Sequence, residues 1–139
     1  MTYLDGCIFA ESKGYILKDF VCPLKSFSVA VDGTYAIAIN RSAIEPGEDK
    51  TVLFHELGHC DTGSFYNEYS SCDVHQRHEN RADKWAIKKL VPEDELDQAV
   101  ADGHTELWDL ADHFGVTEDF MRKAVCWYTH GNLATELYF

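Results

Sequence analysis

The sequence predicts an α+β fold in which a small antiparallel sheet packs on two central helices and a C-terminal helical subregion follows. Three observations support this prediction. Two runs of alternating side chains around a turn predict the sheet, and two longer helical patterns carry clustered histidines and carboxylates. Shorter helical patterns separated by glycines then continue toward the C-terminus. In order along the chain, these features lie at 26–40, at 46–60 and 73–90, and at 93–128.

The composition fits one domain over residues 1–139. Of these residues 45% are hydrophobic, which is enough for one core. We expect the sheet and the two central helices in residues 1–91 and the helical subregion in residues 92–139. No stretch approaches the ~18 apolar residues of a membrane helix, and the N-terminus lacks the layout of a secretory signal. The five cysteines include no CxxC pair, so we expect a cytoplasmic protein with reduced thiols and no membrane partner.

The net charge of −12 is unevenly distributed. From Pro92 onward, 11 acidic residues stand against Arg122 and Lys123, so a net charge of −9 lies in the C-terminal subregion. Such a surface repels phosphate backbones, which disfavours direct binding of nucleic acid. The segment LADHFGVTEDFMRKA reads like a helix-turn-helix, but its second helix begins with Glu118 and Asp119. We therefore favour a packed helical pair with a protein-contact surface over DNA recognition.

Asp32 and Gly33 separate the two predicted strands, a common signal for a β-hairpin. A two-residue loop would mix large and small side chains on both faces of the pair. A loop of odd length would separate them, and we expect this odd loop because the buried face sets the register. The expected buried face holds Phe27, Val29, Val31, Tyr35, Ile37 and Ile39, and the other face holds Ser28, Ala30, Ala36 and Ala38.

Prolines, glycines and capping residues divide the rest of the chain into helices. The first helix opens at Pro46 and runs to about Cys60, and it is apolar nearly all round, which predicts a central position. Asp73 can cap a second helix that reaches about Leu90. Three shorter helices follow at about 93–102, 106–114 and 118–128, with caps at Thr105 and Thr117 and stops at Gly103 and Gly115.

HELGH at 55–59 is an HExxH motif on the first of these helices. The spacing places His55 and His59 one turn apart on one face, where both can bind one zinc ion, while Glu56 sits beside the metal's water. The alternative is a pair of helix histidines satisfied by hydrogen bonds alone. Buried charged or polar groups need partners, and a single metal ion would serve His55, His59 and the nearby Glu56 together.

A zinc site needs a third protein ligand, and Glu79 in HENRADKWA at 78–86 is the best candidate. Glu79 and Asp83 share one stripe with the apolar residues of the second helix, so both carboxylates point inward. The alternative is two solvated carboxylates paired with basic neighbours, which the inward stripe disfavours. Asp83, one turn after Glu79, can accept the other ring N–H of a ligand histidine and fix its tautomer.

These motifs resemble the ImmA/IrrE family of zinc metallopeptidases. HELGH is followed by ENRADKWA, which is similar to the family's second motif, E-x-x-A-N/D-x-F/W-A. The preceding strand AIAIN and the segment LADHFGVTEDFMRKAV extend the resemblance over roughly residues 27–128. The chain departs from the family at the N-terminus, where members often carry a longer helical segment, and at Asp83, where asparagine is frequent.

The resemblance implies a zincin-type HExxH helix beside a second ligand-bearing helix, as in gluzincins. Zinc would be bound by His55, His59 and Glu79, with Glu56 as the catalytic base. Manganese or iron could occupy the same donor set. The group that stabilises the oxyanion is left open. Candidates near the motifs are Tyr66, Tyr69, His75 and His78, each of which is equally an ordinary surface or packing residue.

The resemblance also implies a regulatory role. Family members are usually found with a helix-turn-helix repressor, in phages or other mobile elements, and relieve repression by cleaving it. The expected partner is therefore a protein substrate, a basic helix-turn-helix repressor. Its positive charge would complement the acidic C-terminal subregion. The alternative is a zinc-bound module that binds or senses a repressor without cleaving it. Glu56, which a binding module does not need, favours the enzyme.

Overall fold

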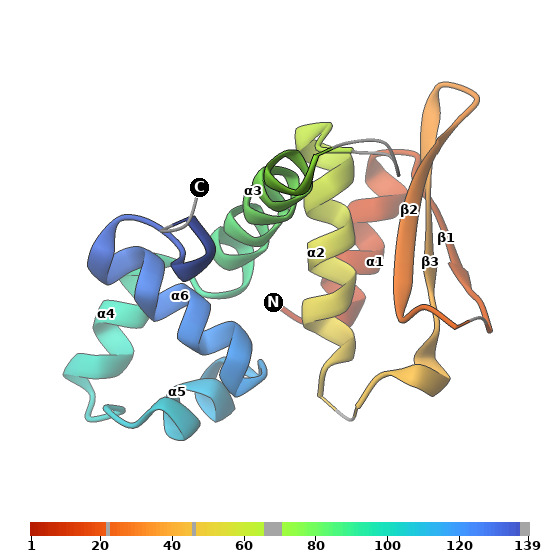
Figure 1. The fold of residues 1–139 in the computed structure, drawn as a ribbon. Coiled ribbons are helices and arrows are strands. Elements are labelled where there is room, and N and C mark those ends of the chain that lie inside the picture. Colours follow the sequence, from red (N-terminus) through yellow and green to blue (C-terminus); the bar gives the residue numbers. More distant parts are fainter. Residues whose placement is uncertain (22, 46, 66–70, 137–139) are drawn as a thin grey trace.

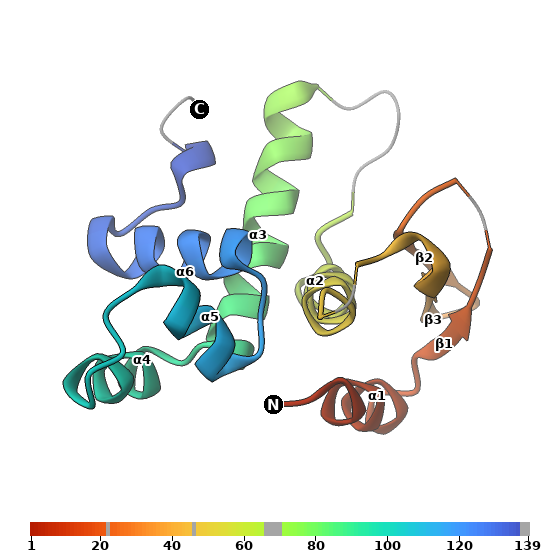
Figure 2. The ribbon, with the colours of Figure 1, turned by 90° about the horizontal axis from the view of Figure 1, so that it is seen from below.

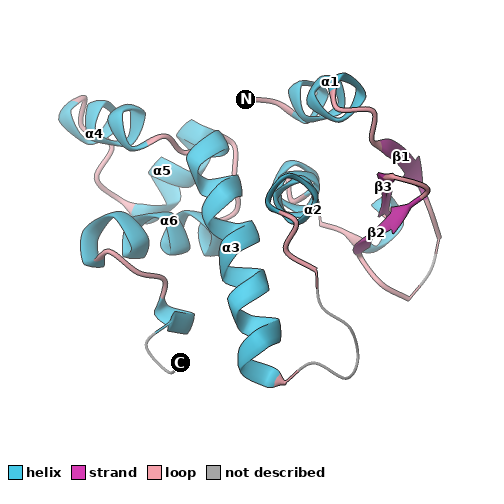
Figure 3. Ribbon diagram, turned by 90° about the horizontal axis from the view of Figure 1, so that it is seen from above, coloured by secondary structure: helices cyan, strands magenta, loops and turns pink. Residues whose placement is uncertain are grey.

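The computed structural model describes residues 1–139 except 22, 46, 66–70 and 137–139. It has the predicted α+β class, with a three-stranded sheet at one end and a group of short helices at the other (Figure 1). Helix α2 (Asp49–Thr62) lies between the sheet and helix α3 (Cys72–Leu90), as Figures 2 and 3 show in views in which α2 is seen end-on. Three further helices lie on the far side of α3, namely α4 (Glu93–Ala101), α5 (Leu107–Phe114) and α6 (Glu118–His130).

The N-terminal helix α1 (Tyr3–Ser12) and the strand after it, β1 (Ile16–Asp19), were not predicted. A capping box starts α1: the backbone N–H of Thr2 donates to Asp5, and the backbone N–H of Asp5 donates to the Thr2 hydroxyl. Gly6 faces α2 so closely that an added Cβ would lie 2.7 Å from the Leu53 side chain. The spacing of Thr2 and Asp5 was therefore a readable helix signal.

The sheet is mixed, not antiparallel as predicted. Its strand order is β1-β3-β2, where β2 (Ser26–Val31) pairs antiparallel with β3 (Thr34–Ile39) and β1 pairs parallel with β3. The antiparallel prediction holds for the hairpin alone. Because β3 is central, β2 is an edge strand, and none of the described strands pairs with its second side.

The predicted odd hairpin loop is wrong. Val31 pairs with Thr34 and Val29 with Ala36, which leaves a two-residue loop of Asp32 and Gly33. Both loop residues have positive φ, 46° and 80°, as a type I′ turn requires. Directly opposed residues share a face, so the large side chains of the two strands lie on opposite faces. Phe27, Val29 and Val31 therefore lie on the face opposite Tyr35, Ile37 and Ile39.

Helix α2 explains this register, since it packs across β2 and β3 on the face that holds Ile37 and Ile39. Both isoleucines are fully buried, and β2 contributes only serine and alanine side chains beside them. The large side chains of β2 turn outward, where Val29 and Val31 remain 42% and 37% exposed. A strand at the edge of a sheet tolerates exposed apolar side chains. The alternation of large and small residues in the sequence does not show which strand lies at the edge.

The predicted helices after the sheet are all present, with small shifts at their ends. Helix α3 begins one residue before Asp73, with Ser71 at the N-cap position. Glu106 takes the N-cap position of α5 in place of Thr105, while Thr117 caps α6 as predicted by accepting from the N–H of Phe120. No helix in the described part of the chain combines the length and apolar character needed to cross a bilayer.

Helices α2 and α3 touch at Gly58, between the two histidines of the HExxH motif. A Cβ at this position would lie 2.6 Å from the backbone oxygen of Ala82. The predicted inward stripe of α3 is confirmed there, because Ala82 and the apolar residues after it are buried. The core around this contact includes Ile37, Ile39, Leu53, Phe54, Leu57, Ala86, Ile87 and Leu90.

Replacing Gly58 with alanine should separate α2 from α3. The clash is with backbone atoms, so we expect a loss of about 2–3 kcal/mol in the free energy of unfolding, together with weaker metal retention. Gly33→Ala is the control. Gly33 has a positive φ, so alanine there should strain the hairpin and cost about 1 kcal/mol, but an added Cβ would contact no other atom and metal retention should not change. Denaturant unfolding and metal analysis of both variants test this. Full metal retention by Gly58→Ala would contradict it.

Candidate metal centre

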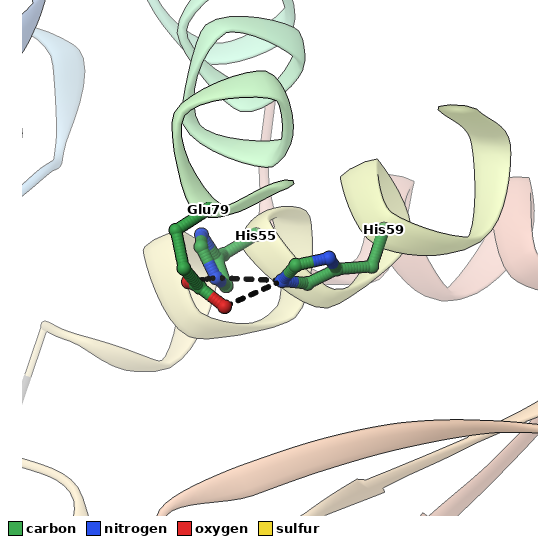
Figure 4. Close-up of side chains that lie close together, drawn as sticks. All are labelled: His55, His59 and Glu79. Carbon is green, nitrogen blue, oxygen red and sulfur yellow. Dashed lines mark hydrogen bonds and ion pairs between the residues drawn. The ribbon is translucent and has the colours of Figure 1, made fainter. Parts of the chain in front are cut away.

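Side chains from α2 and α3 converge on one point between the helices. The Nε2 atoms of His55 and His59 lie 3.2 Å apart, and the Glu79 carboxylate lies 2.7 Å from the first and 3.2 Å from the second. Figure 4 shows the three side chains facing one another. Among the described residues they are the group of histidine, cysteine and carboxylate side chains whose donor atoms lie close enough to hold a metal.

The orientation of each imidazole is set by a hydrogen bond at its other ring nitrogen. His55 Nδ1 donates to Asp83 Oδ1 at 2.7 Å, the contact predicted from the spacing of Glu79 and Asp83. His59 Nδ1 donates to the backbone oxygen of Ser64, a buried residue just after α2. Both rings therefore present Nε2 toward Glu79, the arrangement that metal-binding histidines usually have.

The donor set fits a zinc-like ion. Donor atoms about 2.0–2.1 Å from a tetrahedral ion are separated by about 3.3 Å. The 3.2 Å spacings of His59 Nε2 from His55 and from Glu79 match this value. The separation of 2.7 Å between His55 and Glu79 is that of a charge-assisted hydrogen bond. Small side-chain movements would therefore bring all three donors to coordination distance.

Two carboxylates, Glu79 and Asp83, flank His55. Burial lowers the pKa of His55, but hydrogen bonds to Asp83 and Glu79 outweigh it and raise the pKa to about 10. Burial raises the pKa of Asp83, but His55 and Lys123 outweigh it and hold that pKa below its usual value. The same two carboxylates also favour a cation at this position.

Glu56 lies beside the cluster and is 6% exposed. It lines a cavity of about 460 Å³ together with His55, His59 and Glu79. The hydroxyl of Ser26, on the edge strand β2, donates to Glu56 Oε1 at 3.0 Å. Sequence reasoning did not identify Ser26, because only the observed hairpin register turns its side chain toward α2.

A second cavity, of about 600 Å³, is also lined by residues of this cluster. Ser26, His55 and Glu79 line both cavities, so the two adjoin at the candidate metal donors. The first cavity is bordered by β2, and the second by α3 and the N-terminal part of α6. The candidate donors are therefore bordered by both cavities.

Cys60 directly follows His59 but does not join the metal donors. Its side chain is buried, and burial together with the nearby Glu56 carboxylate raises the pKa of the thiol to about 12. A cysteine binds metal as the thiolate, which this environment disfavours.

The oxyanion-stabilising group remains unassigned. Tyr66 and Tyr69 lie outside the described residues. His75 and His78 lie in α3, but neither lines the two cavities described beside the cluster. Their proposed role stays a prediction.

An HExxH helix with a glutamate from the following helix is the His2Glu donor set of zinc hydrolases. A sequence model of the IrrE N-terminal-like domain, peptidase family M78, matches residues 15–125. The match spans most of the chain, which therefore belongs to this family. It includes the sheet, helices α2 to α5 and the first part of α6, up to residue 125. No curated protein and no solved structure matches the chain significantly.

Replacing Glu79 with alanine should weaken metal binding more than the ~10–100-fold that loss of a ligand's hydrogen-bond partner costs. The reason is that Glu79 contributes a donor atom facing both histidines. His75→Ala and His78→Ala, on the same helix, are the matched controls and should retain the metal. Chelator competition with each purified variant measures this. Loss of metal from either control, with retention by Glu79→Ala, would show that the ligand set is wrong.

Proposed function

We propose that this chain is a zinc-dependent endopeptidase with His55, His59 and Glu79 as metal ligands and Glu56 as the catalytic base. Membership of a peptidase family and the convergence of the three donor side chains support this proposal. The observation that carries it is the position of Glu56, a buried carboxylate that lines the cavity beside the donors without being one of them. Manganese or iron would suit the same donors.

In this mechanism a bound zinc ion would lower the pKa of a water molecule and polarise the scissile carbonyl. Glu56 accepts the proton of the attacking water and delivers it to the leaving amine. Ser26 keeps the Glu56 carboxylate turned toward the cavity through its hydrogen bond. Asp83 and Ser64 hold the two imidazoles in the tautomer that presents Nε2 to the ion.

The edge strand β2 offers a way to hold the substrate. Its Ser26 and Ser28 line the cavity beside the metal donors, and its outer edge is unpaired in the described sheet. We expect an extended substrate segment to add to this edge through backbone hydrogen bonds. Such binding would carry the scissile bond past Glu56 while depending little on the substrate's side chains.

The substrate we propose is a basic helix-turn-helix repressor. Residues 1–91 would supply the sheet and the catalytic helix pair, and residues 92–139 would contact the repressor. The support is electrostatic: this subregion carries a net charge of −9, whereas a DNA-reading domain is positive where it meets phosphates. The alternative is a zinc-bound module that senses a repressor without cleaving it, and Glu56 favours the enzyme because binding alone does not require it.

Replacing Glu56 with glutamine should leave metal content and fold unchanged but lower turnover at least about 10²-fold, since a general base contributes about 10²–10⁴-fold. Glutamine retains an oxygen that can accept from Ser26. The test is zinc-loaded protein mixed with the helix-turn-helix protein of the adjacent reading frame, with products identified by mass spectrometry. Activity within tenfold of the wild type would place the base elsewhere. Binding without cleavage by the wild type would support the sensing module instead.

Reversing the charge of α4 should slow cleavage of the repressor while sparing metal content and hydrolysis of small peptides. Opposite potentials speed encounter, so higher salt should slow the wild type in the same way. The variant replaces Glu93, Asp94, Glu95 and Asp97 with lysine, all of them exposed.

Lysines in the first turn of α4 oppose the helix dipole, so a second variant reverses only Asp97 and Asp102, near its C-terminal end. A control reverses Glu11, Asp19 and Glu45, exposed residues in the N-terminal half. Circular dichroism checks the folding of all three. If the α4 variants cleave the repressor at the wild-type rate and with the wild-type salt response, the acidic helices are only a solvated face.

A further inference from the structure

A lysine of the C-terminal subregion reaches the metal centre through Asp83. Lys123, on α6, places its Nζ 3.2 Å from Asp83 Oδ2. The other oxygen of the same carboxylate, Oδ1, accepts from His55 Nδ1 at 2.7 Å. Lys123, Asp83 and His55 therefore form a continuous chain of charge-assisted hydrogen bonds that ends at a proposed metal ligand.

The burial of the three groups shows which of them depends on the others. The side chain of Asp83 is 11% exposed, so each of its oxygens needs a partner inside the protein. The side chain of Lys123 is 48% exposed and can reach water when the contact is broken. Without Lys123, the buried Asp83 carboxylate would keep only its contact with His55. It could then rotate toward the cavity that it lines together with α6.

We propose that Lys123 is a positioning residue for the metal centre. By holding Oδ2 of Asp83, it keeps Oδ1 directed at His55 and so keeps Nε2 of His55 directed at the metal. The proposal rests on metal binding by His55, His59 and Glu79, as in the proposed function. It assigns to α6, which lies outside both ligand-bearing helices, a direct part in setting the geometry of the centre (Figure 1).

Simple electrostatics predicts the opposite effect on metal binding. Lys123 is a cation near a site for a cation, so removing its charge should tighten metal binding if charge repulsion were its main influence. A positioning role predicts weaker binding. The sign of the change in metal affinity therefore distinguishes the two explanations.

Lys123 also lines the cavity bordered by α6, so a loss of activity alone could reflect a lost substrate contact. Metal affinity in the absence of substrate avoids this ambiguity. The visible absorption of the cobalt-loaded protein adds a second measurement, because it reports the geometry of the coordinated donors.

The experiment compares zinc dissociation constants, measured by chelator competition, for the wild type and three variants. Lys123→Met should weaken zinc binding about 10-fold, the lower end of the loss for a ligand's hydrogen-bond partner, and should alter the cobalt spectrum. Lys123→Arg keeps a charged donor and should restore most of the affinity. Arg122→Met is the matched control: it removes the same charge from the next position of α6, where Arg122 is 63% exposed and pairs with Asp119.

Unchanged or tighter zinc binding by Lys123→Met, with an unchanged cobalt spectrum, would overturn the positioning role. Equal weakening by Arg122→Met would also overturn it, since the effect would then belong to α6 as a whole. Failure of the wild type itself to bind zinc would instead contradict the proposed function. Thermal unfolding of the metal-free variants separates a local change at His55 from a general loss of stability.

Discussion

The close approach of α2 and α3 at Gly58 is the constraint on which the metal centre depends. The HExxH motif can supply two donors from one helix, and here the candidate third donor, Glu79, comes from a second helix, so the separation of the two helices must be nearly fixed. Gly58 permits this, because a side chain there would meet the backbone of Ala82. Glu79 lies one turn before Ala82 on α3, so the same contact places its carboxylate opposite His55 and His59. The packing of the two helices therefore also sets the geometry of the three donor atoms.

Periodic spacing is why so much of the centre could be predicted from sequence. His55 and His59 are one turn apart, and Glu79 shares a stripe with apolar residues, so helix geometry alone placed these three side chains. The contact between His55 and Asp83 followed from the same spacing. Ser26 and Lys123 could not be found in this way, because they come from a strand and a helix distant in sequence. Only the tertiary packing brings them to Glu56 and Asp83.

The error in the hairpin has a specific physical origin. The odd loop was preferred because it gathered the large side chains, whereas the fold places α2 over a face where β2 contributes small ones. The Asp32–Gly33 turn was the better signal, since two consecutive positive φ angles fit a two-residue loop. The register also matters for chemistry. In the odd register, with Ile37 and Ile39 still facing α2, Ser26 would point away from Glu56. The two-residue turn therefore directs the Ser26 hydroxyl toward Glu56, the proposed base, to which it donates a hydrogen bond.

Two kinds of interaction attach the C-terminal subregion to α2 and α3, and they differ in how sensitive they are to small movements of α6. Apolar packing buries Phe120, Met121 and Ala124 of α6, but such contact is non-directional and tolerates small shifts. Hydrogen bonds are directional: Lys50 of α2 donates to the carbonyl of Phe114 at 2.7 Å, and Lys123 contacts Asp83. A small shift of α6 that preserves the apolar packing would still change the contact between Lys123 and Asp83. Through the proposed role of Lys123, the orientation of His55 would then depend on the position of α6.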